Sequence, residues 1–326
     1  MRHLVAAMVF AVAPAVAQDR EKLSSTEYAV ITQLTFKAPD AAVQKLLPAG
    51  FELDARDAGP SKGFNFAIIL LDHLMSQNPE GKPLPPHTTI PMTIPAKKTA
   101  TGESVLVVFN GLVGQADVPG PYGVYGAAKL TVERRSQTDA DGKSIIDETW
   151  QAKADDGSML EVQLQFVRGV PTRGKGEPKL HSGRQPEFYR HYKVELVADV
   201  ARSTVTGIDR VNKFSIKATG PRFEPLFNGA EQLISITSVP SYSLAVYVPV
   251  DVPPRLRPPA PTKCQMDYLA LDKTGVVQAL AERSNGARSS ADPPLSTCLQ
   301  QSVEELGRGS ISRATQAGIC PKVPRR

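Results

Sequence analysis

The chain has 326 residues, of which 41% are hydrophobic and 22% charged, a composition typical of a globular protein and not of a disordered one. The formal net charge is +5, and residues 255–326 account for it with 11 Lys or Arg against 6 Asp or Glu. Because no basic run interleaved with aromatic residues occurs in that segment, a nucleic-acid partner is not expected.

The first 17 residues have the layout of a secretory signal peptide. Residues 1–3 give a positive start, residues 4–12 are apolar, and residues 15–17 form a small-residue Ala-Val-Ala cleavage pattern. The apolar run is too short to cross a bilayer and no later run is longer, so no transmembrane segment is expected. The sequence therefore predicts cleavage after residue 17 and a periplasmic or secreted protein. A buried N-terminal helix is the alternative.

Strand patterns dominate residues 25–252, which we expect to form one β-rich α+β domain. Its mainly antiparallel sheet is expected to curl into a barrel or cone, and a two-sheet sandwich without a cavity is the alternative. A short helix is predicted at 41–47, before Pro48. Residues 79–98 and 169–186, rich in proline or glycine, are expected to be loops, the first with an extended piece. β-branched and apolar runs predict strands at 28–36, 64–71, 105–113, 124–135, 144–153, 159–168, 188–200, 203–219 and 233–252.

Two Asp-Gly turns divide residues 124–168 into a three-stranded meander. In its third strand the two faces differ in character. One face is polar, and is expected to meet water or a polar cavity. The other is apolar and predicts a core contact through Leu160, Val162, Leu164 and Phe166.

A stiff proline-rich connector, residues 253–262, separates this domain from a basic tail, residues 263–326, with two predicted helices. The tail contains all three cysteines, Cys264, Cys298 and Cys320. In an oxidising compartment one disulfide is expected, and both Cys298–Cys320 and Cys264–Cys298 remain open. The cysteine spacing matches no metal-ligand pattern, so no metal site is expected.

Several enzymatic signatures are missing: the sequence has no GxSxG, HExxH, GxGxxG or P-loop, and no cofactor is expected. The scattered histidines are interpreted as surface or hydrogen-bonded side chains. Asn65 and Asn110 interrupt apolar runs, where an amide needs a partner from protein, water or ligand. With Tyr122 and Tyr125 they are the candidate ligand-binding residues, and a purely structural role is the alternative for the two amides.

Two segments resemble acetoacetate decarboxylase-like proteins. Residues 46–53, LLPAGFEL, resemble the early LLPxGxEL element of that family, and residues 122–129, YGVYGAAK, resemble its GxExxGxPKK segment. The resemblance extends over residues 28–250 in the order of elements. It implies a β-barrel that binds a small keto acid, with the Schiff-base lysine of the family falling on Lys129.

The resemblance is incomplete at this lysine. Leu130 stands where the family has a second lysine, and Ala128 stands where it has a proline. An amine becomes a useful nucleophile near neutral pH only when desolvation or a nearby cation lowers its pKa. Lys129 also alternates with Thr131 and Glu133 on one strand face, so the alternative is a lysine on a solvated sheet surface.

Three functions follow as hypotheses. The first is a decarboxylase-like lyase that binds a small keto acid or similar carbonyl compound through Lys129. The second is a non-catalytic protein that binds a small molecule in the same cavity. The third is an envelope interaction module that uses the basic tail.

Overall fold

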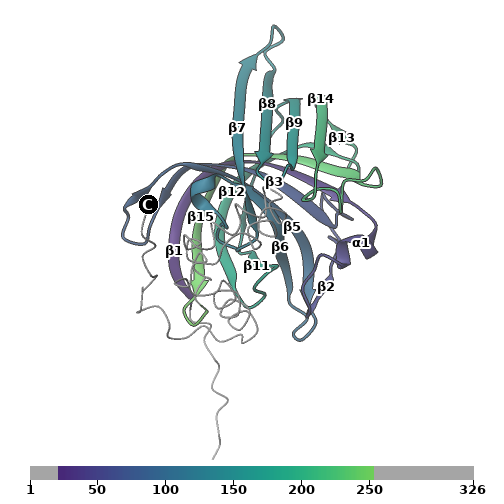
Figure 1. Cartoon of the computed structure of the whole chain (residues 1–326). Coiled ribbons are helices and arrows are strands. Elements are labelled where there is room, and N and C mark those ends of the chain that lie inside the picture. Colours follow the sequence, from purple (N-terminus) through teal and green to yellow (C-terminus); the bar gives the residue numbers. More distant parts are fainter. Residues whose placement is uncertain (1–20, 253–326) are drawn as a thin grey trace, which may run out of the picture. The chain divides into compact units, whose positions relative to one another are not determined.

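The computed structural model describes residues 21–252 of the chain (Figure 1). The segment predicted to be a signal peptide, the proline-rich connector, the three cysteines and the basic tail lie outside the described residues. What the sequence predicts for them stays a prediction. No helix within the described range has the length and apolar character needed to cross a membrane.

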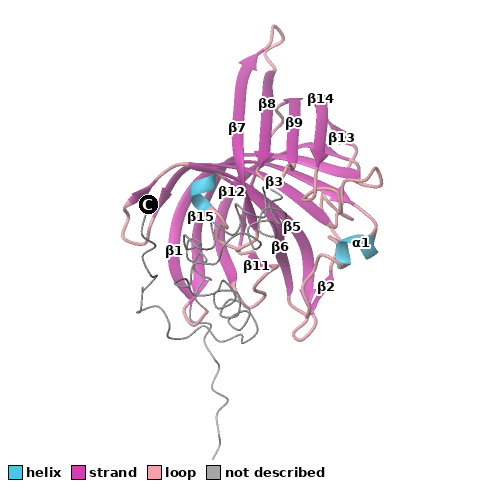
Figure 2. Ribbon diagram, in the orientation of Figure 1, coloured by secondary structure: helices cyan, strands magenta, loops and turns pink. Residues whose placement is uncertain are grey.

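Seven strands close into a barrel (Figure 2). Each is hydrogen-bonded to the next, and the last pairs back with the first, so the barrel has no free edge. All pairs are antiparallel except β11 with β6. This arrangement confirms the predicted β-rich barrel and excludes the sandwich. In order around the barrel the strands are β6 (Ser104–Val113), β11 (Lys179–Ser182), β12 (Tyr189–Ser203), β15 (Gln232–Pro249), β1 (Glu21–Lys37), β3 (Phe66–Gln77) and β5 (His87–Lys98).

The barrel wall depends on unusually long strands. β1 has 17 residues and β15 has 18, and their pairing is interrupted by register shifts typical of β-bulges. Bulges bend a strand and increase its twist, which allows a long pair to curve round a closed barrel. Short elements complete the domain: α1 (Asp40–Gln44), η1 (Gln115–Asp117), β2 (Phe51–Leu53), β4 (Pro83–Leu84), β10 (Thr172–Gly176) and β13 (Ile208–Asp209).

A second, four-stranded antiparallel sheet continues from the barrel. It begins where β7 (Tyr125–Thr138) runs parallel to the end of β6 for three residue pairs and then leaves it. β8 (Ser144–Ala154), β9 (Met159–Val167) and β14 (Val211–Thr219) follow across the sheet, and its first three strands are the predicted meander. In Figure 1 this sheet stands above the barrel.

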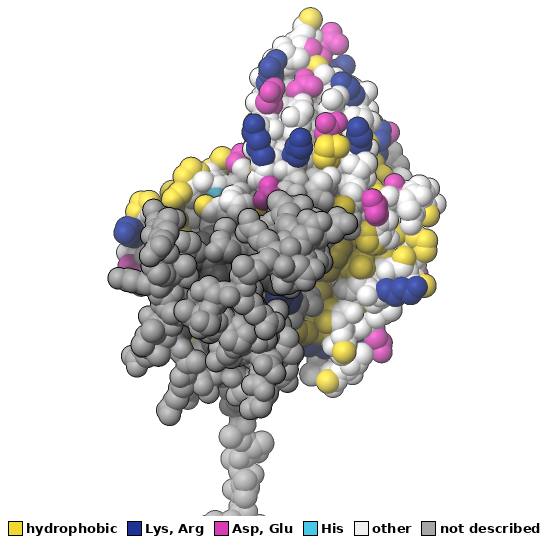
Figure 3. Space-filling view, in the orientation of Figure 1, with side chains coloured by type: hydrophobic (Ala, Val, Ile, Leu, Met, Phe, Trp, Pro, Cys, Tyr) yellow, Lys and Arg dark blue, Asp and Glu magenta, His cyan; other side chains and the backbone are white. Residues whose placement is uncertain are grey.

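The main hydrophobic core lies between this sheet and the outer surface of the barrel. The apolar face predicted for the third meander strand is buried, with Leu160 and Val162 both 0% exposed. These side chains belong to one cluster with Phe36, Phe66 and Ile68 from β1 and β3. The opposite face of the sheet is exposed and carries mixed charges, as the upper part of Figure 3 shows. The polar face of the meander therefore meets solvent.

A buried carboxylate links the two sheets. Glu148 of β8 is 2% exposed, and its Oε2 accepts hydrogen bonds from Thr32 Oγ1 at 2.5 Å and Trp150 Nε1 at 3.1 Å. Arg134 of β7 donates from Nε to Glu148 Oε1 at 3.0 Å and reaches Asp72 on β3. Since Thr32 and Asp72 belong to the barrel, these contacts fix the sheet at one position on its outer wall.

Two predicted loops contain strands. Residues 79–98, expected to be irregular, hold β4 and all twelve residues of β5. Residues 169–186, expected to be a surface loop, hold β10 and β11. Cross-strand pairing overrides local composition in both places: Pro91 and Pro95 occur within β5, and β11 supplies the parallel pair that closes the barrel.

Candidate functional site

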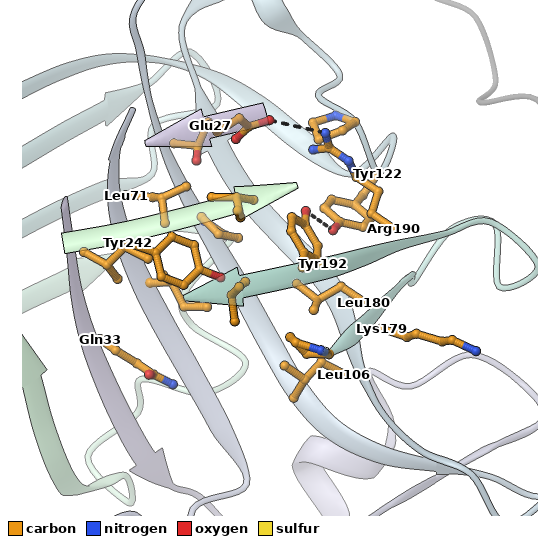
Figure 4. Close-up of a pocket in the computed structure, with 18 of the residues that line it drawn as sticks. Glu27, Gln33, Leu71, Leu106, Tyr122, Lys179, Leu180, Arg190, Tyr192 and Tyr242 are labelled. Atoms are coloured by element: carbon orange, nitrogen blue, oxygen red, sulfur yellow. Dashed lines mark hydrogen bonds and ion pairs between the residues drawn. The ribbon is translucent and has the colours of Figure 1, made fainter. Parts of the chain in front are cut away.

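The barrel lumen contains a cavity of about 1460 Å³. Figure 4 shows how side chains from opposite walls point into it. Its middle section is apolar, and one end is polar. The apolar section is formed by Ile31, Ile69, Leu71, Leu106, Leu180, Val194, Leu196, Val239, Tyr242 and Leu244.

Strand alternation explains which residues face the lumen. On β1, Glu27, Ile31 and Gln33 line the cavity, whereas Leu34 and Phe36 point outward into the core beneath the second sheet. Successive side chains of a strand point to opposite faces, so one strand supplies residues both to the cavity lining and to the core outside the barrel. The barrel wall is therefore apolar on its outer side and lines a partly polar space on its inner side.

Glu27 is the centre of the polar end. It is 5% exposed, and its Oε2 lies 3.0 Å from His73 Nδ1 on β3. Its Oε1 accepts a hydrogen bond from Ser25 Oγ at 2.6 Å and lies 3.6 Å from Arg190 Nη2 on β12. Three strands thus bring a carboxylate, an imidazole and a guanidinium together inside the barrel.

Burial and charge act in opposite directions on this cluster. Burial alone raises the pKa of Glu27, but the close contact with His73 and the positive charge of Arg190 outweigh it and lower that pKa to about 2. For Arg190, burial lowers the pKa, and Tyr192 and Glu27 outweigh it and raise the pKa. The carboxylate and the guanidinium are therefore both charged at neutral pH.

The charge of Glu27 makes the free energy of unfolding of the barrel depend on pH in the acid range. Its pKa is 4.5 when unfolded and about 2 when folded, so its contribution is fully present above pH 4.5 and is lost as the pH falls toward 2. We expect this contribution to be about 3 kcal/mol. Urea unfolding between pH 5 and 2 should show a smaller loss of stability in Glu27→Gln than in the unchanged chain. Equal acid dependence of the two proteins would contradict this assignment, and Glu133→Gln, an exposed site, is the matched control.

Tyrosine hydroxyls complete the polar end. Tyr122 and Tyr192 share a hydrogen bond of 2.5 Å between their hydroxyl oxygens, and the guanidinium of Arg190 lies over the Tyr192 ring at 5.5 Å. Burial raises the pKa of both phenols, so each keeps its proton at neutral pH. Only one of the two protons lies between the oxygens, so the pair has a second O–H with which to donate a hydrogen bond.

Two glycines hold Tyr125 in the wall. A Cβ at Gly111 would lie 2.5 Å from the Tyr125 ring, and one at Gly120, whose φ is +69°, would also lie 2.5 Å from it. A side chain at either position would occupy the space of the aromatic ring. The close approach of backbone to ring therefore explains why these two positions are glycine.

Replacing Gly111 by alanine should push the Tyr125 ring out of place. We expect a loss of about 1–3 kcal/mol in the free energy of unfolding, typical of overpacking. Gly114→Ala is the control, because a Cβ there meets only Asp117 Oδ2 at 3.8 Å. Chemical denaturation of both variants checks the prediction, which fails if Gly111→Ala and Gly114→Ala are equally stable.

A pair of stacked imidazoles lies beside the carboxylate. The His73 and His87 rings are 4.0 Å apart and nearly parallel, and both line the cavity. His73 Nε2 lies 3.3 Å from Thr89 Oγ1. Burial and the neighbouring His73 lower the pKa of His87, which favours a neutral ring there.

The structure places the predicted ligand-binding residues in two groups. Tyr122 and Tyr125 line the cavity. Asn65 lies outside it, with its amide bonded to both backbone groups of Ala38. Asn110 also lies outside, bonded to Arg222. Both amides are bonded to protein groups outside the cavity, which fits the purely structural role that the sequence left open as the alternative to ligand binding.

Lys129 does not line the cavity. It is an exposed residue on β7, directly opposite Lys153 of β8. The Schiff-base role implied by the family resemblance requires a desolvated amine. Because the polar face of the meander meets solvent, Lys129 lacks that environment.

The polar cluster itself was missed from the sequence. Glu27 precedes the predicted strand 28–36, and His73 follows the predicted strand 64–71. Arg190 and Tyr192 fall within a predicted strand but alternate with other polar residues, so no pattern distinguished them. Within residues 21–252 no group of three or more His, Cys, Asp or Glu side chains is placed to hold a metal ion.

The fold and site define a closed β-barrel with an amphipathic lumen. No known protein-family model matches the chain, and no curated protein matches it. Solved structures do resemble it. One is an acetoacetate decarboxylase-like enzyme from Sphingomonas wittichii RW1, with 13% identity and a TM-score of 0.43 over 74% of this chain and 96% of that one.

Two further solved structures are similar. The enduracididine biosynthesis enzyme MppR, complexed with the condensation product of pyruvate and imidazole 4-carboxaldehyde, has 11% identity and a TM-score of 0.45, over 68% of this chain and 87% of that one. An acetoacetate decarboxylase has 7% identity and a TM-score of 0.40, over 72% of this chain and 91% of that one. Acetoacetate decarboxylase-like proteins are thus among the structures this chain resembles, as its sequence segments predicted.

Proposed function

We propose that the protein binds a small amphipathic molecule inside the barrel, with an apolar body along the lumen and a hydrogen-bond-accepting end at the polar cluster. The observation that carries this proposal is the cavity of about 1460 Å³ with a charged guanidinium at one end of an apolar wall. Ligand sites typically combine a mostly apolar concave surface with a few polar groups that fix orientation.

The polar cluster defines the kind of end group. Arg190 only donates hydrogen bonds, and the tyrosine pair has a second O–H to donate. Glu27 is already engaged by His73, Ser25 and Arg190. The groups that remain for a ligand are therefore donors, and they suit a carbonyl or carboxylate oxygen.

The apolar section defines the body. Its wall consists of aliphatic side chains together with the ring of Tyr242. Burying a hydrocarbon body against such a wall contributes about 25 cal/mol for each Å² removed from water. A carbonyl compound with an alkyl or aryl tail, of which a keto acid is one case, fits both parts of the cavity.

Isothermal titration calorimetry with three probes tests this function. The probes share a phenylbutyl body and differ in the end group: 4-phenylbutan-2-one, 4-phenylbutanoate and 4-phenylbutylamine. We expect the ketone and the carboxylate to bind with one site per chain and more tightly than the amine, whose cation meets Arg190. Equal binding of all three, or no binding of any, would overturn the proposal.

The proposed binding function does not require a Schiff-base lysine. The described residues place no desolvated lysine in the cavity: among its lining residues, the side chains of Lys97 and Lys179 are 47% and 25% exposed. Treatment with borohydride in the presence of acetoacetate should therefore leave no adduct on the chain. A mass increase on any lysine would restore the Schiff-base hypothesis.

A further inference from the structure

Glu27, His73 and Thr89 form a buried series of polar contacts whose chemistry the binding function does not use. The carboxylate Oε2 lies 3.0 Å from His73 Nδ1, and His73 Nε2 lies 3.3 Å from Thr89 Oγ1. All three residues line the cavity and are 5–6% exposed. A purely structural cluster needs no orientation toward a cavity, whereas these three residues border the space assigned to the ligand.

The carboxylate fixes the tautomer of the imidazole. An ionised carboxylate 3.0 Å from Nδ1 favours a proton on that nitrogen of a neutral His73 ring. Nε2 is then the basic nitrogen, and it accepts the hydrogen bond of the Thr89 hydroxyl. This is the arrangement of a base oriented by a third group, the general requirement for acid–base catalysis by histidine.

The groups around Glu27 and His73 suit one reaction class. The guanidinium of Arg190 lies beside Glu27 on the side opposite His73, because Arg190 Nη2 approaches Oε1 and His73 approaches Oε2. Arg190, the tyrosine pair and His73 all line the same cavity, so a ligand whose carbonyl oxygen meets Arg190 shares that space with the His73 ring. Donors that bind a carbonyl oxygen bind the enolate oxygen more strongly, since it carries the developing negative charge.

We propose that Glu27 and His73 act as an acid–base dyad that enolises a bound carbonyl compound, with His73 as the catalytic base and Glu27 as the positioning residue. This rests on the proposed function, because it requires the carbonyl end of a ligand at Arg190. His73 Nε2 takes a proton from the carbon next to the carbonyl. The C–H electron pair becomes the C=C bond, and the carbonyl π pair moves onto the oxygen as an enolate. Return of a proton from Nε2 to carbon restores the carbonyl compound, so the step needs no oxidant, reductant or co-reactant.

Deuterium exchange tests the dyad directly. Full-length protein is mixed with 4-phenylbutan-2-one or 2-oxo-4-phenylbutanoate in D₂O, and loss of the α-proton signals is followed by NMR. We expect exchange at least ten-fold faster than in buffer with an equal concentration of denatured protein. Glu27→Gln and His73→Gln should each lower the excess rate at least ten-fold, while Glu133→Gln, whose side chain is 70% exposed, should leave it unchanged.

A conservative variant separates a positioning role for Glu27 from a structural one. Glu27→Asp keeps a carboxylate, so folded Glu27→Asp should retain more of the excess exchange rate than folded Glu27→Gln. Equal rates in the two folded variants would assign Glu27 a merely structural role. This comparison also serves if His73→Gln fails to fold.

The outcomes distinguish this inference from the binding function. If calorimetry shows the ketone bound but exchange equals the buffer rate, the dyad is not catalytic and the binding function stands. If exchange survives His73→Gln in folded protein, another base acts and the inference is wrong. If no probe binds, the binding function itself fails.

Discussion

Replacing Arg190 by methionine is expected to weaken binding of 4-phenylbutanoate by roughly 10- to 150-fold. Hydrogen bonds to charged groups contribute about 1.5–3 kcal/mol, and this is the contribution that the variant removes. Methionine keeps much of the length and apolar volume of the arginine stem, so the cavity wall is preserved. Arg135→Met is the matched control, because the Arg135 side chain is 81% exposed on the second sheet.

Calorimetry on both variants decides this prediction. The loss of affinity should be larger for 4-phenylbutanoate than for 4-phenylbutylamine, because only the carboxylate gains from the guanidinium charge. Circular dichroism must show that Arg190→Met is folded, since the change also leaves Glu27 with only His73 and Ser25 as partners. A folded Arg190→Met protein that binds the carboxylate as well as Arg135→Met does would remove Arg190 from the site.

Replacing Trp150 by alanine is expected to give the largest loss of stability. Trp150 is 1% exposed and fills the core between the second sheet and the barrel. Removing a buried tryptophan side chain typically costs about 3–5 kcal/mol, through lost apolar burial and the cavity left behind. The variant also removes the Nε1 donor of Glu148, which stays buried among Thr32 and Arg134.

Denaturation followed by circular dichroism measures this effect, because Trp150 is the single tryptophan of the chain and its fluorescence is lost in the variant. Tyr28→Ala, at a site 50% exposed, is the control and should change stability by less than about 1 kcal/mol. A loss of the same small size in Trp150→Ala would mean that the second sheet contributes little to the stability of the barrel.

The sequence predicts the position of the strands better than it predicts which other segments they pack against. Alternation locates the meander, because both its turns are Asp-Gly and its apolar face is continuous from Leu160 to Phe166. Alternation alone does not show whether a polar face meets solvent or the barrel lumen. The polar face that includes Lys129 looks outward because the apolar face of the same strands covers the barrel, a contact between segments far apart in the chain.

The candidate site was predictable only in part for the same reason. Tyr122 and Tyr125 were predicted as ligand-binding residues, and both line the cavity. Glu27, His73 and Arg190 come from three strands that are distant in sequence, and each alone looks like an ordinary polar residue near a strand end. Only closure of the barrel places them within contact distance.

The central claim is that the lumen is the binding site, and filling it tests this most directly. Leu71→Trp adds a large side chain to the apolar section of the cavity, whereas Leu74→Trp adds the same side chain three residues along β3, where Leu74 is 58% exposed. Calorimetry with 4-phenylbutan-2-one should show at least a ten-fold loss of affinity for Leu71→Trp and no change for Leu74→Trp. Full affinity in folded Leu71→Trp protein would show that the probe binds somewhere other than the barrel.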